Sequence, residues 1–294
     1  MGEVRIDPVL GTVVHVVGAR QSRPNLPVDG CPFCVGGVEA PDPYEVRWFP
    51  NRWPAMEGAR CEVVLYTPDH SASFPSLGVD GVRRVIDLWA DRTAVLGARP
   101  DVDHVLVFEN RGAEVGATIA HPHGQIYAFD HVPARPGRRL RAGWRPDHDP
   151  GARSVTSVDD WRAWVPFAPT HPIEIQIAPD RPLPDLPSMS VRDRGTFAAV
   201  LVDVLGRLDR LFGRPVPYMM WLNQRPTGGP LAELADPCWF NVEIVSPWRA
   251  GGVARFIAAA EIATEEYFNP VVPEELAAAL RHLGTERGAG SCCP

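Results

Sequence analysis

The sequence predicts a two-lobed α+β protein with antiparallel sheets and helices packed outside. The order strand, strand, helix, strand, strand occurs twice along the 294 residues. The corresponding strands of the two halves carry Asn110 and Asn223. A span rich in proline and charge, at about 132–155, separates the halves. We therefore expect an N-terminal domain over residues 1–150 and a C-terminal domain over residues 151–294.

The pattern of apolar residues gives each element in turn. In the first half we expect a strand pair, a helix and two more strands, at 46–70, 80–99, 104–112 and 117–129. In the second half the same elements are expected at 161–181, 192–213, 217–229 and 237–247. Two more helices are expected at 253–263 and 273–283. The 32 prolines are about twice the usual share, so long loops are expected, for example at 131–137.

The composition is that of an ordinary soluble globular protein, with 45% apolar and 22% charged residues. A net charge of −7 argues against a general nucleic-acid binder, which usually carries a basic face. No signal-peptide pattern opens the chain and no apolar run approaches the length of a membrane span. A cytoplasmic protein that binds neither nucleic acid nor membrane is expected. Six cysteines are too few and too scattered for a disulfide scaffold.

The stretch "ATIAHPHGQIYAF", residues 117–129, is the strongest chemical signal. In a strand, alternate side chains share one face, so His121, His123 and Gln125 are expected to project together. A neutral imidazole is a good nucleophile or base near pH 7. Gln125 can donate a hydrogen bond to a phosphate oxygen, and the glycines and Thr118 just upstream can cradle the same phosphate. The alternative is a structural strand whose polar groups are all hydrogen-bonded.

Cys31 and Cys34 form a CxxC pair in "GCPFCVGG". A redox pair, a zinc half-site and two buried cysteines are all open interpretations. No helical pattern follows Cys34, and the glycines suit a zinc knuckle. Two further ligands must then come from elsewhere, and His70 and His121 are the candidates.

Several segments occur in the order of one known family over most of the chain. They are "ARQSRP", "CPFC", "FPNRWPAM", "YTPDHS", "FENRG", "HPHGQIY" and "RFIAAAEIA". The sequence thereby resembles the galactose-1-phosphate uridylyltransferases, a branch of the histidine-triad superfamily. The resemblance implies two histidine-triad-like domains. The first is catalytic and carries the zinc site, whereas the second is catalytically degenerate, since "PCWFNVE" stands where the first has "HPHGQIY".

The resemblance implies a double displacement. His123 attacks the α-phosphorus of UDP-glucose and releases glucose 1-phosphate, and galactose 1-phosphate then accepts the uridylyl group to give UDP-galactose. The carbonyl of His121 holds His123 in the reactive tautomer, while Gln125 and Thr118 stabilise the transferring phosphoryl group. Hydrolases of the superfamily usually carry a third histidine where Gln125 stands, so the glutamine favours transfer over hydrolysis.

The resemblance also implies binding residues and partners. One structural zinc is expected on Cys31, Cys34, His70 and His121. The positions expected to bind substrate are Arg20, Arg23, Asn51, Arg52, Asn110, Gly116, Arg255 and Glu261. Family members are dimers in which the partner subunit completes each active site, so a homodimer with shared active sites is expected.

The sequence departs from the family at three places. Basic residues in "VPARPGRRL" and the lack of histidine in "WFNVEIVSP" predict that a second metal site found in some members is absent. Arg255 replaces a lysine at the hexose end, where Ala260 and Tyr267 also differ from the family pattern. Arg52 replaces an aspartate near the ribose. Another sugar or base, such as an ADP-sugar, is therefore an open alternative, as are a histidine-triad nucleotide hydrolase and a catalytically dead nucleotide-binding protein.

Overall fold

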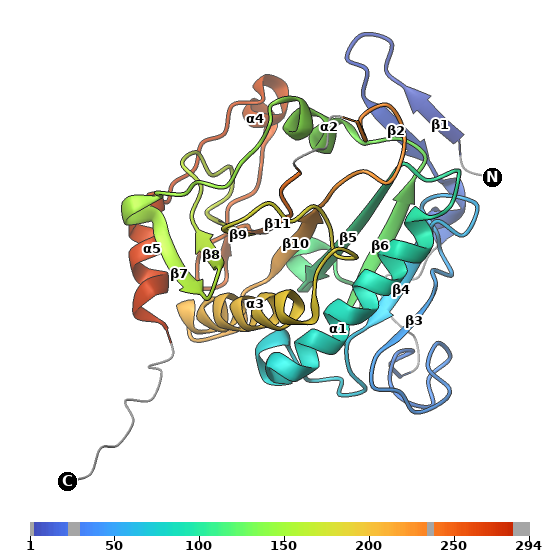
Figure 1. Cartoon of the computed structure of the whole chain (residues 1–294), viewed down its shortest axis with the longest axis horizontal. Helices are drawn as coiled ribbons and strands as arrows, with labels where there is room; N and C mark the ends of the chain where they lie inside the picture. The colour runs from blue at the N-terminus through green and yellow to red at the C-terminus, as the bar shows by residue number, and fades with distance from the viewer. Residues whose placement is uncertain (1–2, 23–29, 234–237, 285–294) are drawn as a thin grey trace.

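A computed structural model describes residues 3–22, 30–233 and 238–284. Nine strands form one sheet in the order β3-β4-β6-β5-β10-β11-β9-β8-β7, and every neighbouring pair is antiparallel (Figure 1). The first five are β3 (Arg47–Pro50), β4 (Cys61–Leu65), β5 (His104–Arg111), β6 (His123–Phe129) and β7 (Ser154–Val158). The others are β8 (Trp161–Trp164), β9 (Ile173–Pro179), β10 (Tyr218–Asn223) and β11 (Asn241–Ser246).

Two long helices, α1 (Phe74–Gly97) and α3 (Val191–Leu211), lie together across one face of this sheet (Figure 1). Their apolar stripes and the inward side chains of the strands form one continuous core. The side chain of Ser190 accepts a hydrogen bond from the backbone of Asp193, whose carboxylate bonds back, so a capping box starts α3. Helix α5 (Pro273–His282) packs against α3, where Arg207 donates to the carbonyl of Leu280.

The two halves share a single sheet. Strands β3 to β6 and helix α1 come from the first half, and strands β7 to β11 and helix α3 come from the second. They join where β5 pairs with β10, with Asn110 opposite Met219. The expected α+β class with antiparallel strands and helices outside is therefore confirmed. The lobes are fused through backbone hydrogen bonds, and the division into domains 1–150 and 151–294 stays a prediction.

Some elements differ from the sequence prediction. Strand β6 begins at His123 rather than at 117, because Pro122 has no N–H to donate to a strand ladder. The expected loop at 131–137 runs into helix α2 (Ala134–Arg141), whose Pro136 lies in the first turn, where proline is tolerated. Two arginines of α2 pair with the buried Glu243 of β11, which ties the linker to the second half.

The expected helix at 253–263 is correct only in its second half. Strands β12 (Trp248–Ala250) and β13 (Val253–Ala254) form a short hairpin there, and helix α4 spans Ala259–Thr264. The hairpin turn needs the positive φ of Gly252, +75°. A second hairpin, β1 (Glu3–Ile6) with β2 (Val13–Val16), stands apart from the main sheet (Figure 1). None of the described helices is long and apolar enough to cross a membrane.

Candidate active site

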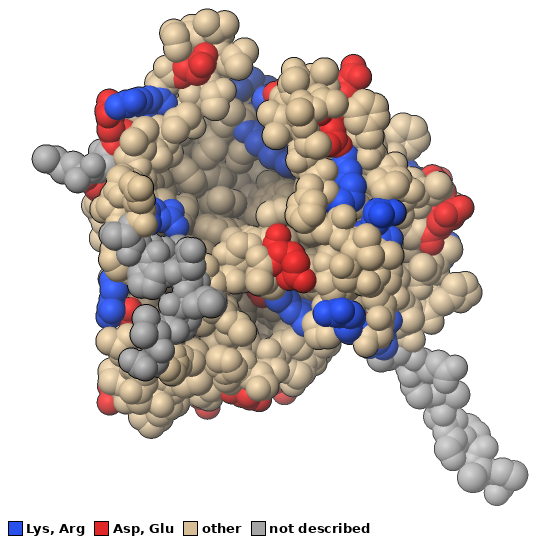
Figure 2. Space-filling view, turned by 180° about the vertical axis from the view of Figure 1, so that it is seen from behind, with Lys and Arg blue, Asp and Glu red and all other residues tan. Residues whose placement is uncertain are grey.

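The face of the sheet that α1 and α3 leave uncovered carries the candidate site. Alternation along the strands directs Phe108 and Asn110 of β5 and His123, Gln125 and Tyr127 of β6 to this face. With Arg20 and residues 116–118 they line a cavity of about 230 Å³. Figure 2, which views the molecule from behind, shows a hollow with basic side chains at its edge.

His123 is held in one tautomer. Its Nδ1 lies 2.7 Å from the carbonyl oxygen of His121. A carbonyl can only accept, so Nδ1 carries the proton and the lone pair is on Nε2. The His123 ring also packs against the ring of Phe33 in an edge-to-face arrangement, with ring centroids 5.1 Å apart. This arrangement suits a nucleophilic imidazole.

Gln125 is oriented by two neighbours. Its Oε1 accepts hydrogen bonds from Nδ2 of Asn51 and from the hydroxyl of Tyr127, each at 3.4 Å. Because Oε1 takes both, the amide NH2 group points the other way as a donor. Tyr127 was not among the expected site residues, although it continues the alternation of His123 and Gln125 by two residues. That alternation was the signal that could have found it.

The loop between β5 and β6 forms one wall of the cavity. Gly112 and Gly116 have φ of +100° and +85°, values that favour glycine. The amide of Ala117 donates to the carbonyl of Gly112 at 3.1 Å, which closes the loop and carries Thr118 to the cavity. The expected neighbours Asn110, Gly116 and Thr118 are therefore brought together with His123.

A larger cavity of about 650 Å³ adjoins the first, and Arg20 lines both. Its walls come from the β1–β2 hairpin and from residues 52–58, and Arg60, Asp101 and Asp130 also line it. Arg52 lines this cavity and forms an ion pair with Glu39, Nε to Oε1 3.0 Å. Arg23, the other basic residue expected here, lies outside the described residues.

Arg255 and Glu261 lie elsewhere. Arg255 directly follows β13, and Glu261 lies on α4, both in the second half of the chain. The two side chains form an ion pair with each other, and neither lines either of the two cavities described above. Arg255 also donates to the carbonyl of Thr170 at 2.9 Å, and Glu261 is buried. Within one described chain these residues do not join His123.

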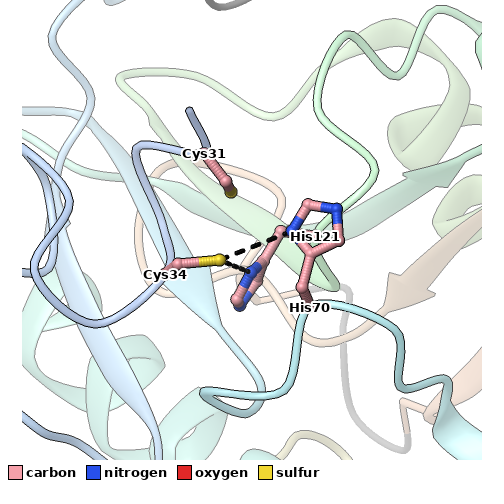
Figure 3. A group of neighbouring side chains, drawn as sticks. All are labelled: Cys31, Cys34, His70 and His121. Atoms are coloured by element: carbon pink, nitrogen blue, oxygen red, sulfur yellow. Dashed lines mark hydrogen bonds between the residues drawn. The ribbon is translucent and has the colours of Figure 1, made fainter. Parts of the chain in front are cut away.

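The four expected metal ligands converge. Cys31, Cys34, His70 and His121 place their ligand atoms within 4.8 Å of one another (Figure 3). The Sγ of Cys34 lies 3.5 Å from Nδ1 of His70 and 3.6 Å from Nδ1 of His121. Two sulfurs and two imidazole nitrogens at this spacing fit one metal ion.

The surrounding chain fixes these ligands. A Cβ at Gly37 would collide with the carbonyl oxygens of Cys31 and Pro32, so only glycine lets the knuckle fold this tightly. The Nε2–H of His121 donates to the carbonyl of Thr67 at 2.8 Å, which leaves Nδ1 toward the cysteines. Burial lowers the pKa of His121, so its ring is neutral, as a ligand must be.

Tyr44 also supports the metal site, although no sequence pattern indicates this role. Its hydroxyl lies within hydrogen-bond distance of the carbonyls of Phe33 and Thr67, at 2.7 and 2.9 Å, either of which can accept its proton, and 3.0 Å from Nε2 of His121. It thus joins the cysteine knuckle to the segments that carry both histidines. The knuckle is also packed on a small second apolar cluster that includes Val63 and Leu65 of β4.

The fold and this site define a uridylyltransferase-like enzyme of histidine-triad architecture. Two solved uridylyltransferase structures superpose on 96% of the chain, with TM-scores of 0.85 and 0.84 at 28% and 26% identity. An ADP-glucose phosphorylase from Arabidopsis thaliana shares the fold, with a TM-score of 0.74 at 22% identity over 96% of this chain and 99% of its own.

The chain belongs to the galactose-1-phosphate uridylyltransferase family. It is 34% identical to the galactose-1-phosphate uridylyltransferase of Thermotoga maritima over 97% of this chain and 100% of that protein. It is 38% identical to the enzyme of Streptomyces lividans over 77% of this chain and 71% of that protein. Residues 53–133 match the family model for the N-terminal domain of galactose-1-phosphate uridyl transferase.

Proposed function

We propose that the protein transfers a uridylyl group from UDP-glucose to galactose 1-phosphate through a covalent uridylyl-histidine on His123. The observation that carries the proposal is the hydrogen bond from Nδ1 of His123 to the carbonyl of His121, inside a cavity that Gln125 also lines. This bond gives Nε2 the lone pair that a phosphorus electrophile needs. The family membership supplies the substrates.

In the first step, Nε2 of His123 forms a bond to the α-phosphorus, and the bond from that phosphorus to the bridging oxygen breaks. Glucose 1-phosphate leaves with the electron pair. The imidazole gains positive charge, which the carbonyl of His121 stabilises through Nδ1–H. In the second step, a phosphate oxygen of galactose 1-phosphate attacks, the P–N bond breaks and UDP-galactose forms. The attacking phosphate is already ionised, so no general base is required.

The phosphoryl group that moves between these bonds needs donors on its oxygens. The amide NH2 of Gln125, oriented by Asn51 and Tyr127, is one. Thr118 and the backbone at Gly116 supply others from the loop wall. None of these groups has to move a proton, which is consistent with transfer between two phosphates.

The nucleoside is assigned to the larger adjoining cavity. Arg20 lines both cavities, so its guanidinium group can bind the phosphates while it borders the cavity assigned to the nucleoside. Arg52 lies on that side with its charge paired to Glu39, and it is the residue that departs from the family pattern near the ribose. A different base, as in an ADP-sugar, is the second candidate on this observation.

Zinc is the metal that the Cys2His2 donor set favours. The ion would hold Cys31, Cys34, His70 and His121 together and take no part in the reaction. Its contribution is to fix the segment just before β6, and with it the carbonyl of His121. The absence of a second metal site remains a prediction.

We assign the missing part of the site to a second copy of the chain, which makes the enzyme a homodimer. Arg255 and Glu261 do not reach His123 within one chain. Large apolar side chains are exposed near them, with Phe256 at 71% and Ile262 at 73%. The β1–β2 hairpin, which borders the nucleoside cavity, also exposes Ile6 at 65%. Such surfaces are suited to burial between subunits.

Intact-mass spectrometry tests the proposal. Mixing the protein with UDP-glucose should add the mass of one uridylyl group, and His123→Ala should abolish the adduct. A parallel panel of ADP-, CDP-, GDP- and dTDP-sugars identifies the base, and sugar 1-phosphates added to the adduct identify the acceptor. Steady release of nucleoside monophosphate without an acceptor would instead establish a hydrolase. A folded protein that forms no adduct with any sugar nucleotide would overturn the transferase.

A further inference from the structure

On the core side of strand β6, the residue between His123 and Gln125 has to be glycine, for a reason unrelated to the cavity. Gly124 lies between His123 and Gln125 and faces the helices. A Cβ there would collide with the hydroxyl of Tyr66 and lie 3.0 Å from the carbonyl oxygen of Phe108. The ring of Tyr66 is packed against Phe74 and Trp89 of α1, with centroids 4.9 and 5.7 Å away. The Tyr66 hydroxyl is therefore held directly against the backbone of β6 between His123 and Gln125.

Behind the other strand of the site is a buried carboxyl group. Glu109 of β5 lies between Phe108 and Asn110, which line the cavity, and is itself only 5% exposed. Its Oε1 accepts a hydrogen bond from the hydroxyl of Tyr218 on β10, at 3.1 Å. Its Oε2 and the hydroxyl of Tyr66 are both buried, and neither has a hydrogen bond of ordinary geometry within the described chain. The two groups nevertheless lie near enough to perturb each other's pKa.

Four charged or titratable groups act on this carboxyl group. Arg111 of the same strand is committed to Asp209 of α3, with Nη1 to Oδ1 2.7 Å. Tyr218 comes from β10 and Tyr66 follows β4, and burial raises the pKa of both hydroxyls far above the usual value. Helix α1 contributes the apolar rings that pack on Tyr66. Among the residues that the structure describes, no cation therefore forms an ion pair with Glu109.

We propose that Glu109 is a positioning residue for nucleotidyl transfer. Its carboxyl group accepts a hydrogen bond from Tyr218 on β10 and lies near Tyr66 behind β6, and so sets the position of Asn110 relative to His123 and Gln125. An apolar side chain would fill the same space without directional bonds, so the carboxyl group costs stability and gives a defined geometry. The proposal rests on the proposed function, because it takes His123 and Gln125 as the reacting strand.

The charge state of Glu109 matters to the site. Burial raises the pKa of Glu109 to about 8, so the group is a neutral acid at pH 7. A neutral acid can donate from one oxygen while it accepts from Tyr218 on the other. Neutrality also keeps a negative charge away from the back of a site that binds phosphates. Ionisation at higher pH removes the donor and adds that charge.

The test compares Glu109→Gln and Glu109→Leu in the uridylyl exchange assay, with kcat and KM measured from pH 6 to 9.5. Glutamine is neutral and keeps both a donor and an acceptor, so its kcat at pH 7 should stay within about threefold of the wild type. Leucine should lower kcat at least about tenfold, with little change in KM, since misplacement acts on the reacting geometry. The wild type should lose kcat above about pH 8, and Glu109→Gln should not lose it.

Controls separate this proposal from simple loss of stability and from the proposed function. Asp193→Asn weakens the cap of α3 and should lower the melting temperature without changing the shape of the pH profile. If Glu109→Leu does not fold, Tyr218→Phe replaces it and should lower kcat with KM unchanged. Wild-type kcat in Glu109→Leu or Tyr218→Phe, or the same alkaline loss in Glu109→Gln, would overturn the positioning role. Failure of the proposed function would appear instead as activity that survives in His123→Ala.

Discussion

The ring of His121 belongs to the Cys/His cluster, and its carbonyl oxygen accepts a hydrogen bond from Nδ1 of His123, with 2.7 Å between the two atoms. One residue thus joins the candidate metal site to the candidate nucleophile. The two sites are not independent, because any movement of the His121 backbone changes the orientation of the His123 ring. Integrity of the cluster should therefore be a condition for activity even though the metal would take no part in the reaction.

Loss of the metal should lower both stability and kcat. His70→Ala removes one ligand but leaves the carbonyl of His121 in place. We expect loss of bound metal, a lower melting temperature and a fall in kcat of about 10- to 100-fold, the range seen when support around a site is removed. Metal content by mass spectrometry, thermal unfolding and exchange activity measure the three effects. Cys238→Ser changes a thiol outside the cluster and should keep metal and kcat; full activity in metal-free His70→Ala would contradict the coupling.

Gln125 should act as a hydrogen-bond donor to the transferring phosphoryl group. Gln125→Ala removes the donor, and we expect the rate of adduct formation to fall about 100- to 1000-fold. Gln125→Glu has nearly the same shape but brings a negative charge to the phosphate, so its loss should be larger. Tyr127→Phe removes one of the two hydrogen bonds to Oε1 and leaves the amide donor in place, so it serves as the matched control with a smaller effect. Single-turnover rates with UDP-glucose measure all three, and equal rates for the alanine and glutamate variants would argue against direct contact with phosphate.

The close approach of Tyr66 to Gly124 should make that glycine irreplaceable. Gly124→Ala places a methyl group against the Tyr66 hydroxyl, and we expect a loss of about 1–3 kcal/mol of unfolding free energy. Gly195→Ala is the matched control, because Gly195 lies in helix α3 with no atom within 4 Å of the added Cβ. That change should stabilise the protein by about 0.5–1 kcal/mol. Chemical denaturation measures both, and a Gly124→Ala protein as stable as the wild type would show that β6 can move away from Tyr66.

Local patterns in the sequence predicted part of the site, for a physical reason. Alternation is a property of any strand, so His123 and Gln125 could be placed on one face without knowledge of the rest of the fold. The same pattern included His121 in the strand, which is wrong because Pro122 delays the ladder. His121 still contributes, through a backbone atom that no pattern of side chains reveals.

Long-range packing accounts for what the sequence could not predict. Glu109 reads as part of "FENRG", but its burial depends on α1, α3 and β10, which lie far away in the chain. Tyr44 reaches His121 across 77 positions. Arg255 and Glu261 carry motif signals that do not reveal their position in the folded chain, where they pair with each other and line neither cavity of the candidate site. Contacts of this kind depend on the assembled sheet and the helices packed on it.

The raised pKa of Glu109 should also appear in the pH dependence of stability. In the unfolded chain the carboxyl group ionises near pH 4.5, whereas in the folded protein burial holds its pKa at about 8. Between these values only the folded state binds the proton, so folding loses stability as pH rises, by about 1 kcal/mol per pH unit, and the loss ends above the folded pKa. Glu109→Gln has no such proton. The difference in unfolding free energy between Glu109→Gln and the wild type should therefore grow from pH 5 to 8 and then level off. Urea denaturation at pH 5, 6, 7, 8 and 9 measures it, and a difference that is constant over this range would mean that Glu109 is ionised in the folded protein at neutral pH.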